Sequence, residues 1–343
     1  MTATRPRADA RPVAGMACPR LGFLGVGWIG RNRMEAIRRS GVAEVAVVAD
    51  PSAAMCEAAL ESAPGAERAR SLDEILDAGV DGVVIATPSA LHAEQAVTAL
   101  ARGAAVFCQK PLGRTAAATR RVVDAARDAD RLLGVDLSYR HTRAMRAVRD
   151  LVGSGALGDV YAADLTFHNA YGPDKPWFYD AALSGGGCVM DLGTHLVDLA
   201  LWVLGFPKLQ RTGSRLHSRG RVLGPAPGEV EDYANAWLEL GGGTTVRIAC
   251  SWNLPAGRDA VIEAAFYGTA GAAAMRNVDG SFYDFIAERY QGTATERIAA
   301  PPDDWGGRAA VEWARRLGAG DRFDAEAERL VDVAAALDAI YQR

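Results

Sequence analysis

The stretch LGFLGVGWIG, residues 21–30, joins an apolar run to the pattern G-x-G-x-x-G at Gly25, Gly27 and Gly30. An apolar run that enters three glycines and then an amphipathic stretch predicts a strand, a tight turn and a helix. Such glycines permit the turn and let a pyrophosphate approach the backbone at the positive end of the helix. Because glycines also occur in ordinary turns, the motif alone is a weak indication.

Asp50 strengthens this interpretation, because it ends the second apolar run about 20 residues after the last of these glycines. An acid at that point can bind the ribose hydroxyls of a dinucleotide. Its carboxylate would repel a 2′-phosphate, and residues 51–54, PSAA, offer no arginine to accept one. We therefore predict that the chain binds NAD in preference to NADP. The alternative is a structural turn followed by an ordinary strand-end acid.

Short apolar runs alternate with amphipathic stretches from residue 20 to about residue 140, which predicts a parallel sheet covered on both faces. The expected fold class is α/β, with a doubly wound Rossmann domain at residues 20–140. Residues 141–343 carry alternating strands and a hairpin around the glycines at 241–243, so we expect an α+β domain with a largely antiparallel open sheet. A helix at 188–204 should pack against this sheet, and residues 1–19 are expected to form a flexible tail.

The composition favours a small-molecule partner. The chain has 343 residues and a formal net charge of −4, with acidic and basic residues interspersed. We therefore expect no nucleic acid and no membrane surface as partners, and no stretch is apolar enough to predict a membrane span. Five scattered cysteines argue against a disulfide framework and a zinc site, so we expect reduced thiols, a cytoplasmic protein and no metal.

Two further motifs follow predicted parallel strands: ATP at residues 86–88 and QKP at residues 109–111. Ligands bind at the carboxyl ends of the strands in open α/β sheets. Lys110 could be a solvated loop lysine. Next to a cationic nicotinamide, however, its charged form would be disfavoured, and it could exchange a proton near neutral pH.

The predicted helix that contains GGGCVMDLGTHLVDLALW, residues 185–202, places Asp191, His195 and Asp198 on one stripe at helical spacing. Burying carboxylates and an imidazole together is costly unless they are paired or employed. A lone histidine on such a helix is commonly a satisfied core residue. The functional interpretation therefore depends on the neighbouring motifs.

Together these motifs resemble the glucose-fructose oxidoreductase, inositol 2-dehydrogenase and MocA (Gfo/Idh/MocA) family. The resemblance covers most of the chain from about residue 20 and includes, in order, GVGWIG, ATPSALH, CQKPL, GALGDV, GGGCVMDLGTHLVDLALWVLG, VEDYANAWLEL, ACSW and FYGTAGAA. It implies an NAD-dependent oxidoreductase that acts on a secondary alcohol, or the matching ketone, of a sugar, aminosugar or cyclitol. The family usually carries Glu-Lys-Pro, and here Gln109 replaces the glutamate, so any role of that carboxylate does not carry over.

The resemblance places Lys110, Asp191 and His195 around the substrate, opposite the nicotinamide. His195 is the candidate to take the hydroxyl proton while Lys110 bonds the same oxygen, although the sequence leaves open which of the two is the acceptor. Asp191 could hold the imidazole or accept a sugar hydroxyl. Asp198 is expected to be structural, bonded to a backbone or side-chain donor.

The remaining candidates surround these residues. The expected cofactor-binding residues are Gly25, Gly27, Trp28, Ile29, Gly30, Asp50, Thr87, Pro88, His92, Gln109 and Lys110. His92 could cap the cofactor side or simply begin a helix. The expected substrate-binding residues are Tyr139, Arg140, His168, Tyr171, Trp177, Asp191 and His195. The aromatic loop after His168 suits a wall for a sugar ring, although Trp177 could equally pack in a core and His168 could lie on a half-exposed strand face.

Two other functions remain open: an NAD-retaining glycosidase that works through a transient oxidation, and a non-catalytic NAD-binding sensor. The joint presence of Lys110, Asp191 and His195 argues against a sensor. The helix has no cation between residues 185 and 204, which favours a polyhydroxylated ring over a hydroxy acid, unless Arg140 and Arg143 supply a clamp for a carboxylate. The open sheet and the resemblance lead us to expect a homodimer or homotetramer.

Overall fold

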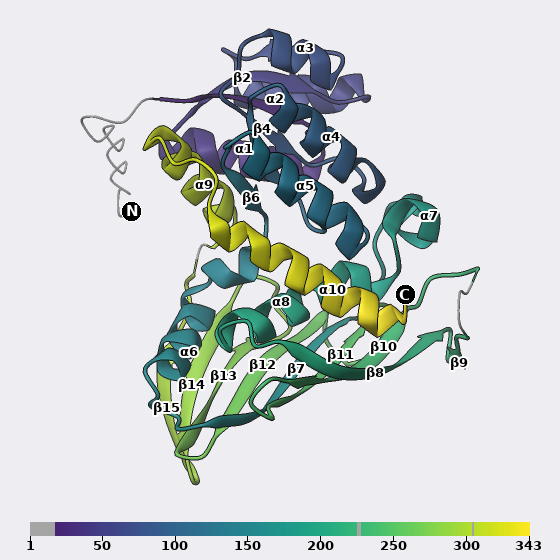
Figure 1. Ribbon diagram of the computed structural model, residues 1–343, viewed down its shortest axis with the longest axis vertical. Helices are drawn as coiled ribbons and strands as arrows, with labels where there is room; N and C mark the ends of the chain where they lie inside the picture. Colours follow the sequence, from purple (N-terminus) through teal and green to yellow (C-terminus); the bar gives the residue numbers. More distant parts are fainter. Residues whose placement is uncertain (1–17, 225–227, 304) are drawn as a thin grey trace, which may run out of the picture.

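A computed structural model describes residues 18–224, 228–303 and 305–343 (Figure 1). Residues 1–17 of the expected tail lie outside this description. Six strands of the first part of the chain form one sheet in the order β3-β2-β1-β4-β5-β6, and all neighbouring pairs are parallel, as predicted. The strands are β1 (Arg20–Leu24), β2 (Glu44–Ala49), β3 (Glu67–Arg68), β4 (Gly82–Ile85), β5 (Ala105–Cys108) and β6 (Leu133–Val135).

Helices cover both faces of this sheet, because its strands bury successive residues on opposite sides. In β4, Val83 and Ile85 join the core under one set of helices, and Val84 joins the core on the other face. The first face carries α3 (Leu72–Asp77), α4 (Ser89–Ala101) and α5 (Ala116–Asp128); the second carries α1 (Trp28–Ser40) and α2 (Ala53–Ser62). The strand order reverses between β1 and β4, and this switch point is where such sheets bind ligands.

The second sheet has nine strands in the order β15-β14-β13-β12-β7-β11-β10-β8-β9. Its pairs are antiparallel except for β7 with β11, and the predicted hairpin at 241–243 joins β10 to β11. The strands are β7 (Val160–Asn169), β8 (Leu209–Ser218), β9 (Arg221–Val222), β10 (Tyr233–Leu240), β11 (Thr245–Ser251), β12 (Ala260–Gly268), β13 (Gly271–Asn277), β14 (Phe285–Gln291) and β15 (Ala294–Ala299). The expected largely antiparallel sheet is therefore confirmed.

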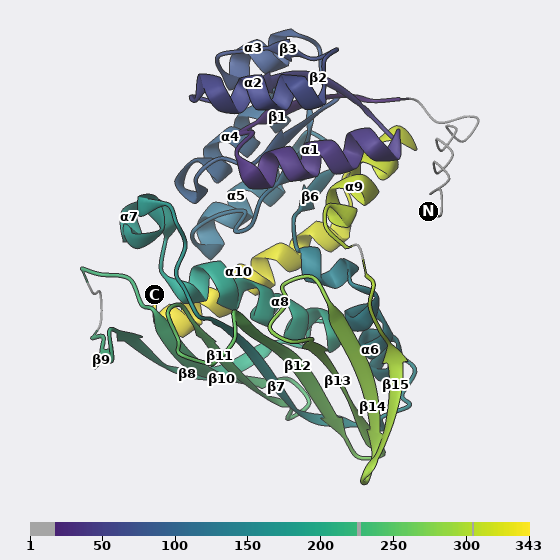
Figure 2. The ribbon, with the colours of Figure 1, turned by 180° about the vertical axis from the view of Figure 1, so that it is seen from behind.

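One face of this sheet packs on helices, and the other is open (Figures 1 and 2). Helices α6 (Arg143–Gly153), α8 (Thr194–Val203) and α10 (Arg329–Tyr341) share a core with alternate strand residues such as Leu165 and Phe167 of β7. The residues between them, Asp164, Thr166 and His168, point to the open face because side chains alternate along a strand.

The last two helices cross the boundary expected at residue 140. Helix α9 (Arg308–Gly318) packs on the first sheet, and Trp313 fills the space above Gly82 and Gly134, where a Cβ atom would lie 2.8 Å from its ring. Helix α10 runs diagonally from the first domain along the second (Figure 1). It packs against α5 and also contributes Leu337 and Ile340 to the second core. The Rossmann unit therefore includes chain from beyond residue 300.

Candidate active site

The glycine loop between β1 and α1 has three glycines with different surroundings. Gly25 has a φ of +85°, and a Cβ there would lie 2.6 Å from the carbonyl oxygen of Ala86. A Cβ at Gly30 would lie 2.0 Å from the carbonyl oxygen of Gly25, so this glycine allows α1 to pack closely on the loop. A Cβ at Gly27, by contrast, would meet no protein atom within 4 Å. Space is thus left at Gly27 and at the first turn of α1, beside Trp28 and Ile29, which fits a pyrophosphate.

Asp50 holds the same loop. Its Oδ2 accepts a hydrogen bond from the Val26 amide at 2.9 Å, and its Oδ1 accepts one from the Ser52 amide at 2.9 Å. Each carboxylate oxygen can accept a second bond, so ribose hydroxyls can still bind. The sequence did not reveal this structural role of Asp50. The carboxylate therefore holds the loop, and its contact with the ribose stays a prediction.

His92 joins the other two loops at the carboxyl edge of the sheet. Its side chain is buried, with Nε2 2.7 Å from the carbonyl oxygen of Thr87 and Nδ1 2.7 Å from that of Pro111. Burial lowers the pKa of the imidazole. Thr87 also donates to Gln95 at 2.6 Å, and Pro88 directly precedes α4. His92 lies in the first turn of α4, as one of the two expectations had it, and there it links the loop of Thr87 and Pro88 to the loop of Lys110.

Lys110 and Asp191 form an ion pair between the two domains. The ammonium of Lys110 lies 2.7 Å from Asp191 Oδ1 and 2.7 Å from the Asp191 carbonyl oxygen. The indole of Trp252 donates to Asp191 Oδ2 at 3.0 Å. Both carboxylate oxygens thus have partners other than His195. Among the described residues no hydrogen bond joins Asp191 to the imidazole of His195, which was one of the two expected roles. Trp252, near the end of β11, was not singled out from the sequence.

His195 lies beside this pair in an aromatic setting. Its ring centroid is 4.9 Å from that of Tyr139, edge to face, and 6.4 Å from that of Phe167. Burial and, after it, the charge of Lys110 lower the pKa of His195 to about 3. The imidazole is therefore neutral at pH 7.

The predicted continuous helix at 188–204 is interrupted at its start. A π-helical turn, η3 (Val189–Gly193), precedes α8. The Thr194 hydroxyl donates to the carbonyl oxygen of Met190 at 2.7 Å, and the Thr194 amide reaches the carbonyl oxygen of Val189, five residues back. Such single wide turns inside helices are frequent at functional sites. Here the wide turn carries Asp191 and ends just before His195.

Gln109 belongs to a buried polar network behind Lys110. Its amide donates to Asp136 Oδ2, which also accepts from Arg33 at 2.6 Å, while Ser138 donates to Asp136 Oδ1 at 2.7 Å. The Arg33 charge and these hydrogen bonds lower the pKa of Asp136 against the opposing effect of burial. A glutamate at position 109, as the family usually has, would therefore place a second carboxylate against Asp136.

Gln109→Glu is accordingly expected to lower the free energy of unfolding by about 3 kcal/mol, because it buries a second charge without a new partner. The deficit should shrink as the pH falls, since the added carboxyl has a raised pKa in the folded protein and is neutral at low pH. Adding Asp136→Asn should restore most of the loss. Denaturant unfolding at several pH values measures all three proteins, and an equally unstable double variant would contradict the explanation.

Two expected substrate-binding residues lie elsewhere. Arg140, in η1 (Ser138–His141), pairs through Nε and Nη2 with both oxygens of buried Asp198, so this bidentate edge of its guanidinium is already used. Asp198 thus has the structural role expected for it. His168 points to the open face of the sheet, where it bonds Ser251 at 2.7 Å and stacks on Tyr233. Strand alternation puts it opposite Phe167, the neighbour of His195, so the expectation for His168 does not hold.

The aromatic loop after β7 approaches the site through Trp252. The ring of Tyr179, in η2 (Pro176–Tyr179), lies 5.5 Å from the indole that bonds Asp191. Trp177 stacks on Phe178 at 3.8 Å, and Tyr171 is exposed. The loop thus supplies aromatic surface next to Asp191, through Tyr179 and Trp252.

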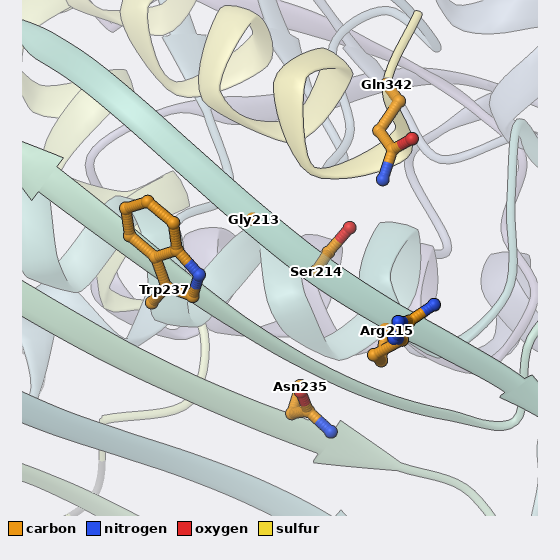
Figure 3. A pocket seen from close by; sticks show the side chains of 6 residues that line it. All are labelled: Gly213, Ser214, Arg215, Asn235, Trp237 and Gln342. Atoms are coloured by element: carbon orange, nitrogen blue, oxygen red, sulfur yellow. The ribbon is translucent and has the colours of Figure 1, made fainter.

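Other features lie outside the site. Figure 3 shows an open hollow over β8 and β10, lined by Gly213, Ser214, Arg215, Asn235, Trp237 and Gln342, to which neither Lys110 nor His195 contributes. All five cysteines are free thiols in this structure. Within the described ranges, no helix has the length and apolarity to cross a membrane, and no three His, Cys, Asp or Glu side chains are grouped as a metal would require.

The first sheet and its glycine loop form a Rossmann fold, and the open-sheet domain brings an Asp and a His to a Lys at the end of a strand. This combination defines a class of dinucleotide-dependent oxidoreductases. Residues 20–137 match the model of the oxidoreductase family with an NAD-binding Rossmann fold, and residues 145–274 match the GFO/IDH/MocA C-terminal domain. The chain belongs to the Gfo/Idh/MocA family.

Its relatives include sugar and cyclitol oxidoreductases. The rhizopine catabolism protein MocA of Rhizobium meliloti is 30% identical over 75% of this chain and 78% of its own length. Inositol 2-dehydrogenase of Rhizobium meliloti strain 1021 is 30% identical over 75% of this chain and 76% of its own. Three sugar oxidoreductases among the other relatives are matched over 55–58% of their lengths.

Solved structures share the fold. KijD10, a 3-ketoreductase from Actinomadura kijaniata in complex with NADP and TDP-benzene, superposes with a TM-score of 0.79 over 95% of this chain and 98% of its own, at 23% identity. Other structures of this fold contain NAD or NADH. The fold is therefore shared by proteins that bind either dinucleotide.

Proposed function

We propose that this protein is an NAD-dependent dehydrogenase that moves a hydride between the nicotinamide and a secondary alcohol or ketone of a sugar, aminosugar or cyclitol. The observation that carries the proposal is the ion pair of Lys110 and Asp191, 2.7 Å between Nζ and Oδ1, beside a neutral His195. Bound NAD supplies the hydride acceptor. Gly27 and the first turn of α1 would hold its pyrophosphate, and Asp50 its ribose.

The protein's own residues then handle the proton. Lys110, which pairs with Asp191, donates a hydrogen bond to the substrate oxygen and stabilises negative charge that develops there. The neutral imidazole of His195 takes the hydroxyl proton as the hydride leaves the same carbon. Asp191 orients Lys110, while the aromatic surface around Trp252 and Tyr179 provides a wall for a ring.

Two ionic contacts favour a polyhydroxylated ring over a hydroxy acid. The arginines that could have clamped a carboxylate are already paired: Arg140 with Asp198, and Arg143 with the buried carboxylate of Asp303. A carboxylate substrate would need one such planar cation beside the reacting carbon.

A substrate panel followed by NADH absorbance tests the function. Hexoses, nucleotide sugars, inositols and aminoglycosides are assayed with NAD, the matching ketones with NADH, and hydroxy acids serve as the contrasting class. Turnover confined to hydroxy acids, or NAD binding without turnover of any ring, would contradict the proposal. Sugar hydrolysis without net NADH would identify the NAD-retaining glycosidase instead.

The preference for NAD is expected to depend on the charge of Asp50. We expect Asp50→Ser to raise the ratio of NADP to NAD affinity by about tenfold, because a carboxylate repels the 2′-phosphate. Asp50→Asn removes the charge but keeps an acceptor oxygen, and serves as the matched variant. Both variants lose loop hydrogen bonds and should melt earlier, so the ratio of the two affinities, measured by titration, is the informative quantity. An unchanged ratio would leave Asp50 with its structural task alone.

We also propose that copies of the chain associate through the open face of the nine-stranded sheet. This face presents the indole of Trp237, which is 38% exposed, together with charged pairs such as Arg247 with Asp164. Exposed aromatic surface of this kind is typical of protein interfaces. Light scattering of the purified protein gives the mass of the assembly, and a monomer would contradict this proposal.

A further inference from the structure

The turn that carries Asp191 begins inside the protein, where its first amides need partners. The first four N–H groups of a helix have no partner within the helix, and buried ones must find one elsewhere. The residues before η3 are Gly185, Gly186, Gly187 and Cys188, none of which has a side-chain oxygen to accept these amides, and the N-cap residue makes no side-chain cap.

Two residues from distant parts of the chain accept all four of these amides. Glu231, just before β10, receives Gly187 N–H and Val189 N–H on Oε1, at 3.0 and 2.9 Å, and Cys188 N–H on its carbonyl oxygen at 2.9 Å. The Tyr341 hydroxyl accepts Met190 N–H at 3.1 Å and donates to Glu231 Oε1 at 2.7 Å. Four consecutive amides are thus satisfied by one buried Glu–Tyr pair.

This arrangement explains the glycines at 186 and 187. A Cβ at Gly186 would lie 2.0 Å from the hydroxyl oxygen of Tyr341, and a Cβ at Gly187 would lie 1.9 Å from the carbonyl oxygen of Glu231. The glycines therefore allow Glu231 and Tyr341 to approach the backbone closely enough to accept its amides.

The end of α10 also bonds the chain on the other side of the ion pair. Asp338 accepts the Ala116 amide at 2.7 Å, and Arg343 donates to the carbonyl oxygens of Arg114 and Gly185 at 2.6 and 2.9 Å. The segment after Lys110 and the segment before Asp191 are thus attached to one helix end.

We infer that Glu231 and Tyr341 are positioning residues, which fix the wide turn so that Asp191 meets the ammonium of Lys110. Asp191 follows directly after the four capped amides, and both its carbonyl oxygen and its carboxylate contact Lys110. A shift of the turn by 1 Å would move both acceptors together. The catalytic meaning of this inference rests on the proposed function, but the geometry can be tested without it.

The chain has three lysines, at 110, 175 and 208, which makes the ion pair easy to follow. The Lys110 side chain is 17% exposed and that of Lys175 is 53% exposed. Trace labelling of the folded protein with acetic anhydride, read by mass spectrometry, gives the reactivity of Lys110 relative to the other two.

In Tyr341→Phe, which lacks the capping hydroxyl, we expect this relative reactivity to rise several-fold. Tyr290→Phe is the matched control, because Tyr290 donates to Glu288 in the same way at the far side of the sheet, 3.1 Å between oxygens.

Glu231 provides the second variant pair. Glu231→Gln keeps an acceptor oxygen for the two amides and should leave Lys110 protected, whereas Glu231→Ala should expose it as Tyr341→Phe does. In an active enzyme, Tyr341→Phe should lower kcat by about tenfold while the Kd for NAD stays within about twofold, since small displacements of reacting groups are costly.

Unchanged Lys110 reactivity in Tyr341→Phe would overturn the inference, whatever happens to activity. A raised reactivity of Lys110 in Tyr341→Phe together with an unchanged kcat would also overturn the inference. If the wild-type protein turns over no ring substrate, the proposed function fails, and the labelling ratio alone decides whether Glu231 and Tyr341 hold the turn.

Discussion

Replacing Lys110 by Met should lower kcat by about a hundredfold or more. The reason is that the substrate oxygen loses the ammonium group that donates a hydrogen bond to it from the loop after β5. The affinity for NAD should change little, since Lys110 contacts Asp191 and takes no part in the glycine loop. His195→Ala should have a similar effect on kcat, through loss of the group that takes the proton. Steady-state kinetics with the best ring substrate and calorimetric titration of NAD measure the two quantities separately.

Two further substitutions at lysine positions make this result specific. Lys175→Met removes an exposed lysine from the aromatic loop and should leave kcat unchanged. Lys110→Arg keeps a charged donor that cannot release its proton at ordinary pH, so it should retain partial activity if Lys110 only donates. A wild-type rate in Lys110→Met would remove this residue from the mechanism. Complete inactivity of Lys110→Arg, with the protein folded, would favour Lys110 as the proton acceptor over His195.

Gly27→Ala should weaken NAD binding by about tenfold or more without changing the stability of the cofactor-free protein. The backbone at Gly27 has a φ of −61°, which alanine adopts easily, and a Cβ there meets no protein atom within 4 Å. The methyl group would instead occupy the space through which a pyrophosphate approaches the first turn of α1.

Gly65→Ala is the matched control, because a Cβ at this position also meets no atom within 4 Å, in a loop between α2 and β3. Thermal unfolding without cofactor should be alike for the wild type and both variants, and only Gly27→Ala should lose affinity in the NAD titration. Equal affinities for all three proteins would show that the pyrophosphate does not lie against this glycine.

The parallel sheet could be predicted because its strands are buried on both faces and appear as continuous apolar runs between helices. The position of α9 could not be predicted, since the sequence of an amphipathic helix does not indicate which of two sheets it will cover. Strand alternation correctly grouped His168 with Asp164 and Thr166. The same alternation sets these polar residues apart from Ala163, Leu165 and Phe167. It could not show that His195, from a distant helix, would lie on the side of Phe167 and not on the side of His168.

The candidate site was predictable where a motif is contiguous, as in the glycine loop and the QKP strand end. The partners that determine its geometry come from distant positions: Trp252 lies 61 residues from Asp191, and Asp136 lies 27 residues from Gln109. Arg140 and Asp198 were each recognised as polar, but their pairing depends on how η1 meets α8. One signal was available in hindsight, since Asp136 ends the apolar run of β6 just as Asp50 ends that of β2.

Helix α10 limits how the two domains can move. Leu330 and Val331 pack with the core of the Rossmann unit, and Val333 and Leu337 belong to the core of the second domain. A rotation that opens the two domains would therefore have to break the apolar contacts on one side of this helix. Such a rotation costs free energy that domains joined only by a flexible linker would not lose. With the proposed function, we therefore expect substrate to enter and product to leave past the aromatic loop around the exposed Tyr179, and not through a hinge between the domains.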